Sequence, residues 1–500
     1  MGLTGNTTNA LLALNGLDLS PNSAVSVEGT EVGLAESGQK VAVLARSGSK
    51  VLSGFEGESS VAGGRTLLLG PISATNLDAL RDLLPWLRPR TLGTRTSAGF
   101  GDRLGLATPG HVRAIRAAGG GLAPIFAQQS IREMDRTGRS PQEVLDDATW
   151  GVFAEGWQEG FGANADHLKT AHDVDARVAA GYSFFTFDPG EYVDDGADAA
   201  GASALRAAFD DLPWQDLEDL PADLKRRYLA SAFEAEGHEV RFDDVSLARA
   251  VVKYGVAVAH VARLYRHLQA TMGQEDFEVE VSVDETERPT THAQHAYIAT
   301  ELRRLGVRWV SLAPRYVGRF EKGVDYMGDV AGFEEDIEVH AAIARTVSPG
   351  GPYKLSLHSG SDKFSIYPAF VRQTRGLAHL KTAGTSYLEA LRTVAALDPD
   401  LFREIYDFSR GRYEEDRASY HVSAQTDRVP DTVGDAELPA LLEQFDAREI
   451  LHVTFGSVLK EARFRDRLMR LLAEHPGYYA AGLEKHFLRH LEPFANGGNR

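Results

Sequence analysis

Eight short apolar runs alternate with longer amphipathic segments between about residue 98 and residue 390. They lie at 99–107, 122–128, 160–168, 181–187, 277–283, 307–313, 353–358 and 378–384. This alternation is typical of βα units, and eight units fit a closed (β/α)₈ barrel of the TIM type better than an open doubly wound sheet. No GxGxxG stands at a strand-to-helix turn, which disfavours a dinucleotide-binding sheet. The sequence therefore predicts an α/β barrel over residues 96–395.

Three segments fall outside the eight-unit pattern. Residues 1–95 contain short alternating runs separated by turn residues, which predicts a small β-rich or α+β cap with a helix near 75–87. About ninety residues separate the fourth and fifth runs, and we expect a helical insertion over about 190–275 there. Residues 396–500 are helical in pattern and are predicted to form a C-terminal extension packed on the barrel.

Composition restricts the partners and the chemistry. The chain has no cysteine, so any metal must be held by His, Asp, Glu, carbonyl or water ligands. Its net charge of −18 disfavours nucleic acid and membrane surfaces as partners, although a cleft of opposite local charge can still bind a small anion. No stretch approaches the ~20 apolar residues of a membrane span, and the N-terminus lacks the basic start of a secretory signal. We therefore expect a cytoplasmic protein. No pattern indicates its oligomeric state.

Polar residues at the predicted strand ends are the candidates for chemistry, because barrels place their sites there. His167 and His358 end the third and seventh strands, and Asp166 adjoins His167. The fifth strand ends in Asp284 and Glu285. Two imidazoles and a carboxylate that leave positions open suit a divalent cation polarising a carbonyl and its neighbouring hydroxyl. Other histidines are more simply explained as helix-face residues: His260, His267, His292, His295, His486 and His490.

Basic residues around the same ends could attract a substrate carboxylate or phosphate. For each of them, ordinary ion pairing in this acidic protein is at least as good an explanation. Glu280 faces the barrel lumen by period-two alternation, and an ion pair with Lys354 is favoured there over a catalytic role. The candidate substrate-binding residues are Lys169, Arg319, Lys363 and Lys381.

Several long strings of the sequence resemble one known family, the tagaturonate/fructuronate epimerases of bacterial hexuronate catabolism. The resemblance runs from about residue 99 to 390, with a weaker echo near 450–490. Strings of this length are more specific than any single ligand spacing. They include GFGDRLGLATPGH, FGANADHLKT, YSFFTFDPGEYVDD, EVSVDETERPTT, PRYVGRFEKGVDYMGD, KLSLHSGSDKFSIYP and HLKTAGTSYLEALR.

The resemblance implies an isomerase that uses a divalent metal cation to interconvert D-tagaturonate and D-fructuronate by inversion at C4. Matched motif to motif, Asp166 corresponds to the proton acceptor, and His167 and His358 correspond to metal ligands. Either Glu285 or Asp284 corresponds to the proton donor. The third ligand is placed at Asp325, with Glu321 second. Zinc, manganese, iron, cobalt and nickel are all compatible with such ligands.

Other functions on the same barrel stay open at this stage. A metal-dependent aldolase or ketose isomerase would use a similar ligand set, and a non-catalytic sugar-binding protein is a third possibility. Two routes to C4 inversion are also open. One is retro-aldol cleavage between C3 and C4, and the other is a transient C3 ketone followed by deprotonation at C4.

Overall fold

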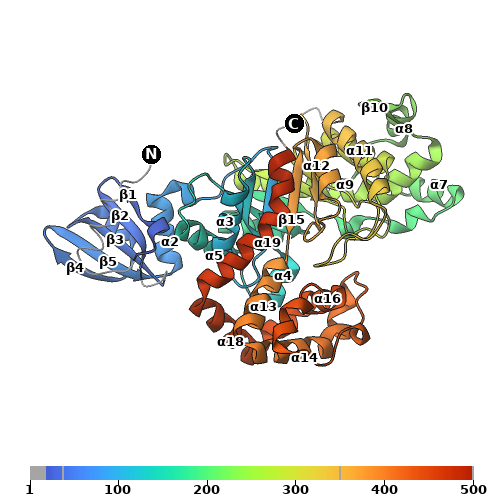
Figure 1. Ribbon diagram of the computed structural model, residues 1–500. Coiled ribbons are helices and arrows are strands. Elements are labelled where there is room, and N and C mark those ends of the chain that lie inside the picture. Colours follow the sequence, from blue (N-terminus) through green and yellow to red (C-terminus); the bar gives the residue numbers. More distant parts are fainter. Residues whose placement is uncertain (1–18, 36–38, 348–350, 498–500) are drawn as a thin grey trace.

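The computed structural model describes residues 19–35, 39–347 and 351–497. Eight parallel strands close into a barrel in the order β6-β7-β8-β9-β12-β13-β14-β15 (Figure 1). This confirms the predicted TIM-type barrel, and each strand overlaps one of the eight apolar runs. The strands are Ser97–Phe100, Ala123–Ser130, Gly162–Leu168, Phe184–Phe187, Glu278–Ser282, Ser311–Ala313, Lys354–Leu357 and Ala378–Thr382, in chain order.

Polar side chains fill much of the barrel lumen and satisfy one another there. Period-two alternation turns Val279 and Val281 toward the surrounding helices and Glu280 inward, as predicted. The expected ion pair between Glu280 and Lys354 is wrong. Lys354 donates to Ser97 Oγ at 3.0 Å, whereas Glu280 pairs with His358 at 2.5 Å. Burial lowers the pKa of Lys354 to about 8, which reduces the cost of leaving it without a carboxylate in contact.

An outer ring of helices covers the barrel. Apolar stripes on these helices pack against the outward-facing residues of the strands, and many strand and helix residues belong to one continuous core. The ring helices are α3 (Thr108–Ala118), α5 (Pro141–Ala154), α6 (Ala171–Ala180), α9 (Asp244–Met272), α10 (His292–Arg304), α11 (Val330–Thr346), α12 (Tyr367–Thr374) and α13 (Thr385–Leu397). A short extra helix, α4 (Ile131–Thr137), follows β7 directly.

The segment between β9 and β12 is more varied than the sequence suggested. It contains α7 (Ala202–Asp210), α8 (Pro221–Leu229) and an antiparallel strand pair, β10 (Phe233–Ala235) and β11 (His238–Val240), that was not predicted. Its last helix, α9, contacts both α6 and α10 and so belongs to the ring itself. Among the described residues, α9 alone is long and apolar enough to cross a membrane, and most of its apolar part is buried within the protein.

The N-terminal residues form an antiparallel sheet in the order β1-β2-β3-β5-β4, followed by α2 (Ala74–Leu83). Figure 1 shows this sheet at one end of the molecule. The chain then passes the amino ends of the barrel strands, where the backbone amides of Leu92 and Gly93 donate to the Glu278 carboxylate. The sheet strands are Val25–Val27, Thr30–Ala35, Lys40–Arg46, Glu58–Ala62 and Arg65–Pro71.

The C-terminal residues form a helical layer on the barrel. The last helix, α19, packs against α3, α12 and α13 of the ring, and α14 contacts α13. Loops between these helices reach the carboxyl ends of the strands. The helices are α14 (Pro399–Asp416), α15 (Leu438–Leu441), α16 (Phe445–Val453), α17 (Phe455–Lys460), α18 (Ala462–Glu474) and α19 (Pro476–Gly497).

Candidate active site

A cavity of about 310 Å³ opens at the carboxyl ends of the barrel strands. Its walls come from the loops after β6, β7, β8, β9, β12, β13, β14 and β15, and from the C-terminal layer. None of the described residues of the N-terminal sheet lines it. The volume lies at the small end of the range for small-molecule sites, and the position is the one where barrels of this type place their chemistry.

A bulge at the end of β8 brings two adjacent polar residues to this cavity. Side chains at neighbouring strand positions normally face opposite sides of a sheet. Here the register with β9 shifts between Ala165 and Leu168, and His167 adopts a left-handed backbone with φ of 55°. Both Asp166 and His167 consequently line the cavity. A positive φ at a residue other than glycine costs free energy and is retained where the surrounding structure requires it.

The orientation of His167 is fixed by a carboxylate behind it. His167 Nδ1 lies 3.0 Å from Asp188 Oδ2, and the other Asp188 oxygen accepts from the Gly190 amide. Asp188 follows β9 directly. With Nδ1 donating to Asp188, Nε2 of the imidazole is left free to face the cavity. A histidine whose second nitrogen is held by a carboxylate is the usual arrangement of a metal ligand.

His358, which follows β14, is held between two carboxylates. Its Nε2 contacts Glu280 Oε1 at 2.5 Å, and its Nδ1 lies 3.3 Å from Asp284 Oδ1. Burial by itself would lower the pKa of this imidazole, and Lys381 acts in the same direction. Glu280 and Asp284 outweigh both effects and raise the pKa of His358 to about 9. The two carboxylates therefore favour a positive charge at this position, either that of the imidazolium or that of a bound cation.

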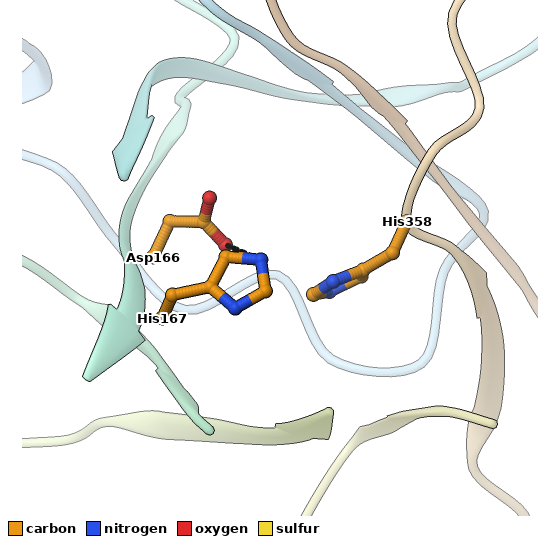
Figure 2. Close-up of side chains that lie close together, drawn as sticks. All are labelled: Asp166, His167 and His358. Atoms are coloured by element: carbon orange, nitrogen blue, oxygen red, sulfur yellow. Dashed lines mark ion pairs between the residues drawn. The ribbon is translucent and has the colours of Figure 1, made fainter. Parts of the chain in front are cut away.

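Three of these side chains form a group that could hold a metal ion. Asp166, His167 and His358 each offer one ligand atom, and these atoms lie within 4.8 Å of one another. Figure 2 shows the two imidazoles and the carboxylate converging from the ends of β8 and β14. Asp166 is buried, and Lys381 Nζ lies 2.8 Å from its Oδ1 and 2.6 Å from its Oδ2. The donor set, nitrogen and oxygen only, fits a divalent transition metal.

Asp166 is ionised in this setting. Burial would raise its pKa, but Lys381 and the two imidazoles outweigh burial and lower the pKa below its usual range. The Lys381 ammonium donates to Asp166 Oδ1 at 2.8 Å, and its own pKa is raised because the charge on Asp166 outweighs the effect of burial. The pair thus places a negative carboxylate and a proton-bearing ammonium side by side at the cavity floor.

The basic residues of the site differ in how free their charges are. Lys169 lines the cavity, is partly exposed and donates to Glu191 at 3.1 Å. Lys363 also lines it, but its ammonium donates to the carbonyls of Glu321, Val324 and Ser361. Arg319 lies in an adjoining cavity and is mostly exposed. Two cations that the sequence reasoning did not select, Lys322 and Arg132, line both cavities.

The C-terminal layer completes one wall through Tyr420 and His452. The segment after Tyr420 is clasped by two carboxylates. Glu321 accepts from the amide and hydroxyl of Ser423, both at 2.7 Å, and Glu449 accepts from the Ala424 amide at 2.8 Å. Burial and the neighbouring Glu321 raise the pKa of Glu449. One proton shared between these carboxyl groups therefore helps to hold the wall in place.

We expect Glu449→Gln to remove part of the pH dependence of stability. A carboxyl group whose pKa is higher in the folded state stabilises the fold least once the pH exceeds that raised pKa. Glutamine can still donate to Glu321 and accept from Ala424, without ionising. Thermal unfolding between about pH 5 and pH 9 should show the wild type losing at least about 1 kcal/mol more than the variant. Parallel pH profiles for the two proteins would contradict this assignment.

Comparisons with known proteins show the family to which this chain belongs. A family model described as tagaturonate epimerase matches residues 26–494. A tagaturonate/fructuronate epimerase from Thermotoga maritima is 46% identical over 419 residues, which cover 83% of this chain and 84% of the relative. This chain belongs to the tagaturonate epimerase family. It is accordingly an epimerase, that is, an isomerase.

Solved structures of the family superpose over nearly the whole chain. The native crystal structure of the fructuronate-tagaturonate epimerase from Cohnella laeviribosi has a TM-score of 0.89 at 36% identity, covering 98% of this chain and 99% of that one. A glycerol complex of the same enzyme gives a TM-score of 0.89 at 37% identity, covering 97% and 98%. The barrel and its N- and C-terminal additions are therefore common to these tagaturonate epimerases.

The residues selected from the sequence are distributed unevenly over this epimerase site. Asp166, His167 and His358 come together as described, and Glu285 lines the cavity, where it pairs with Arg132 at 3.3 Å. Asp284 contacts His358, and its pKa is lowered well below the usual value because His358 outweighs burial. The raised pKa expected of a proton donor is therefore absent at Asp284.

Asp325, the favoured third ligand, lies outside the group. Its carboxylate is exposed and accepts from Ser365 Oγ at 2.9 Å and from the Tyr326 amide at 2.7 Å. Glu321 lines the cavity, but its carboxylate already accepts a hydrogen bond from the Ser423 hydroxyl. Sequence reasoning also missed Glu280 and Asp188 as the carboxylates that hold the two imidazoles. Glu280 lies on the inner face of β12, and Asp188 directly follows β9. These strand positions were the signal in the sequence that could have identified them.

Proposed function

We propose that this member of the tagaturonate epimerase family interconverts D-tagaturonate and D-fructuronate by inverting C4, with a divalent metal cation as cofactor. The observation that carries the proposal is the convergence of Asp166, His167 and His358 at the floor of the cavity. Its support is the family membership together with this ligand geometry. We further propose that the reaction takes place in the cytoplasm, as expected from the sequence.

The two imidazoles of His167 and His358 would hold the metal, with Asp166 close enough to contribute an oxygen. A divalent cation bound there would supply Lewis-acid stabilisation of negative charge on the substrate oxygens. Asp188 and Glu280 orient the two imidazoles from behind. These partners matter because carboxylates behind metal-ligating histidines fix the tautomer and the ring direction.

The substrate carboxylate needs cations that line the cavity and are not buried in a network of protein carbonyls. Lys322 Nζ donates only to Ser359 Oγ at 3.0 Å among the hydrogen bonds of the described residues, and burial lowers its pKa. Arg132 is partly exposed and pairs with Glu285. We propose that these two residues, together with Lys169, bind the carboxylate. The Lys363 ammonium already donates to three carbonyls and therefore stabilises the loop. Lys381 forms an ion pair with Asp166.

Retro-aldol cleavage is the route that these residues favour. The C4 hydrogen is not α to the C2 carbonyl, so its direct removal is unfavourable. Asp166 instead accepts the proton of the C4 hydroxyl, the C3–C4 bond breaks, and an aldehyde and a C2–C3 enediolate result. Rotation of the aldehyde presents its other face, the C3–C4 bond forms again, and Glu285 is the proposed donor of a proton to the new C4 alkoxide. Asp166 then releases its proton to solvent and Glu285 takes one up from solvent before the next turnover.

Turnover in D₂O tests both the activity and the route. Metal-loaded enzyme incubated with D-tagaturonate should produce D-fructuronate that retains hydrogen at C4, as measured by NMR. Prior treatment with a chelator should abolish turnover, and added metal should restore it. Deuterium at C4 would contradict the retro-aldol route, whereas release of free cleavage products would identify an aldolase. Failure to form D-fructuronate with any of the five candidate metals would contradict the proposed function itself.

A further inference from the structure

A second group of metal-ligand side chains lies on the outer wall of the barrel, between α10 and α11. His292 begins α10, and Asp336 and His340 lie one turn apart on α11. One ligand atom from each lies within 4.8 Å of the others. His292 Nε2 is 3.1 Å from Asp336 Oδ1, and His340 Nε2 is 3.7 Å from the same oxygen. None of the three lines the cavity at the strand ends.

Two atoms of this group are buried without a hydrogen bond of normal geometry. His340 is completely buried, and its Nε2, which faces Asp336, makes no hydrogen bond of normal length and angle, although the Thr290 backbone lies near the ring. The second carboxylate oxygen of Asp336 likewise makes none, although the Val317 backbone lies near this carboxylate. Leaving a buried polar atom unsatisfied costs about 1–3 kcal/mol. A pair of such atoms aimed at one point is the arrangement that a bound cation would satisfy.

The hydrogen bonds behind His340 are compatible with the tautomer that binds metal. His340 Nδ1 lies 2.8 Å from His295 Nδ1, and His295 Nε2 lies 2.8 Å from the Tyr353 hydroxyl. If His340 Nδ1 carries the proton, it donates to His295 Nδ1, and His295 Nε2 then donates to Tyr353. This chain leaves the lone pair of His340 Nε2 free toward Asp336.

Solvent reaches this group through a surface groove. The groove is lined by the β10–β11 hairpin on one side and by Thr291, His292 and Val339 on the other. His292 is partly exposed to it, so an ion has a path of entry and water can complete the coordination. The other buried cluster, Asp362 with His486 and His490, differs in kind. His490 Nε2 already accepts the Asp362 amide, and Arg448 pairs with the Asp362 carboxylate at 3.0 Å.

We propose that His292, Asp336 and His340 form a second, structural site for a divalent cation of the zinc class, which fastens α10 to α11. Two imidazoles, one carboxylate and a water molecule give the four-coordinate nitrogen and oxygen shell that Zn²⁺ accepts. The ion joins the first turn of one ring helix to the middle of the next. Its position outside the cavity gives it no part in the reaction.

Metal counting tests this site independently of the proposed catalytic function. Chelator-stripped protein is titrated with Co²⁺, followed by its visible absorption, and with Zn²⁺, followed by elemental analysis. We expect His292→Ala and Asp336→Asn each to bind one ion fewer than the wild type, whatever number the wild type binds. The epimerase activity of the metal-loaded variants should be unchanged. Tyr353→Phe should keep the site but weaken it roughly 10–100-fold, as loss of such supporting bonds does.

His267→Ala is the matched control. His267 is another partly exposed helical histidine that pairs with a single carboxylate, Asp175, at 2.6 Å, with no second imidazole in that pair. It should bind as many ions as the wild type. The proposal is overturned if His292→Ala and Asp336→Asn also keep the full number of ions with unchanged affinity. A loss of activity without a change in this count would concern the catalytic proposal alone.

Discussion

Replacement of His167 by alanine is expected to remove the catalytic metal and to reduce epimerase activity to background. His167 Nε2 is free to face the cavity because Nδ1 is held by Asp188. His358→Ala should have the same effect on metal and turnover. The measurement is metal content after gel filtration, combined with kcat for D-tagaturonate. Full metal occupancy in both variants would show that these histidines are not the ligands.

His358→Ala carries a second consequence that has to be separated from metal loss. The substitution leaves Glu280 and Asp284 without the imidazole that stabilises their charges. Breaking a buried ion pair by removing one partner costs about 3–5 kcal/mol. The double variant Glu280→Gln with His358→Ala also removes the charge of Glu280, which is more deeply buried than Asp284. It should recover part of the lost stability in thermal unfolding while still binding no catalytic metal.

A buried histidine elsewhere in the barrel serves as the control for both variants. His111 on α3 is fully buried and bonds to Ser386 Oγ at 2.9 Å, outside the cavity. His111→Ala should lower the melting temperature, because it leaves a void and removes one of the two hydrogen bonds of the Ser386 hydroxyl, but it should retain its metal. Metal loss in this control would mean that instability alone empties the site.

The barrel could be predicted because its signal is local and repeated. Each βα unit carries its own apolar run, and eight such runs fix which strand ends converge, so His167 and His358 could be placed together from the sequence. The bulge that turns both Asp166 and His167 into the cavity depends on a register shift between β8 and β9. Nothing in the string ADHLK specifies that shift, because pairing register is a tertiary property.

Other parts of the site depend on contacts between distant segments. Tyr420 and His452 come from the C-terminal layer, whose helices follow no strand register, so sequence periodicity could not bring them to the cavity. The partner of Glu280 was misassigned for a related reason. Alternation places Glu280 in the lumen, but the level of a side chain along the barrel axis decides whether it meets Lys354 or His358, and that level follows from strand stagger.

Asp166→Asn is expected to keep the fold and the metal and to lower turnover by ~10²–10⁴-fold, the usual worth of general acid–base catalysis. Asparagine has nearly the same shape but cannot accept a proton from the C4 hydroxyl. Lys381, which lies 2.6 Å from the carboxylate, loses its charged partner as well. The measurements are kcat and KM for D-tagaturonate together with metal content. Because Asp166 acts on the bound substrate, kcat should fall much more than KM changes.

The matched control makes the same chemical change seven residues further along. Asp173 caps α6 by accepting from Thr170 and does not line the cavity. Asp173→Asn should therefore keep wild-type turnover. Loss of metal in Asp166→Asn would identify Asp166 as the third ligand instead of the base, which the ligand distances also permit. Wild-type turnover in Asp166→Asn would remove this carboxylate from the mechanism.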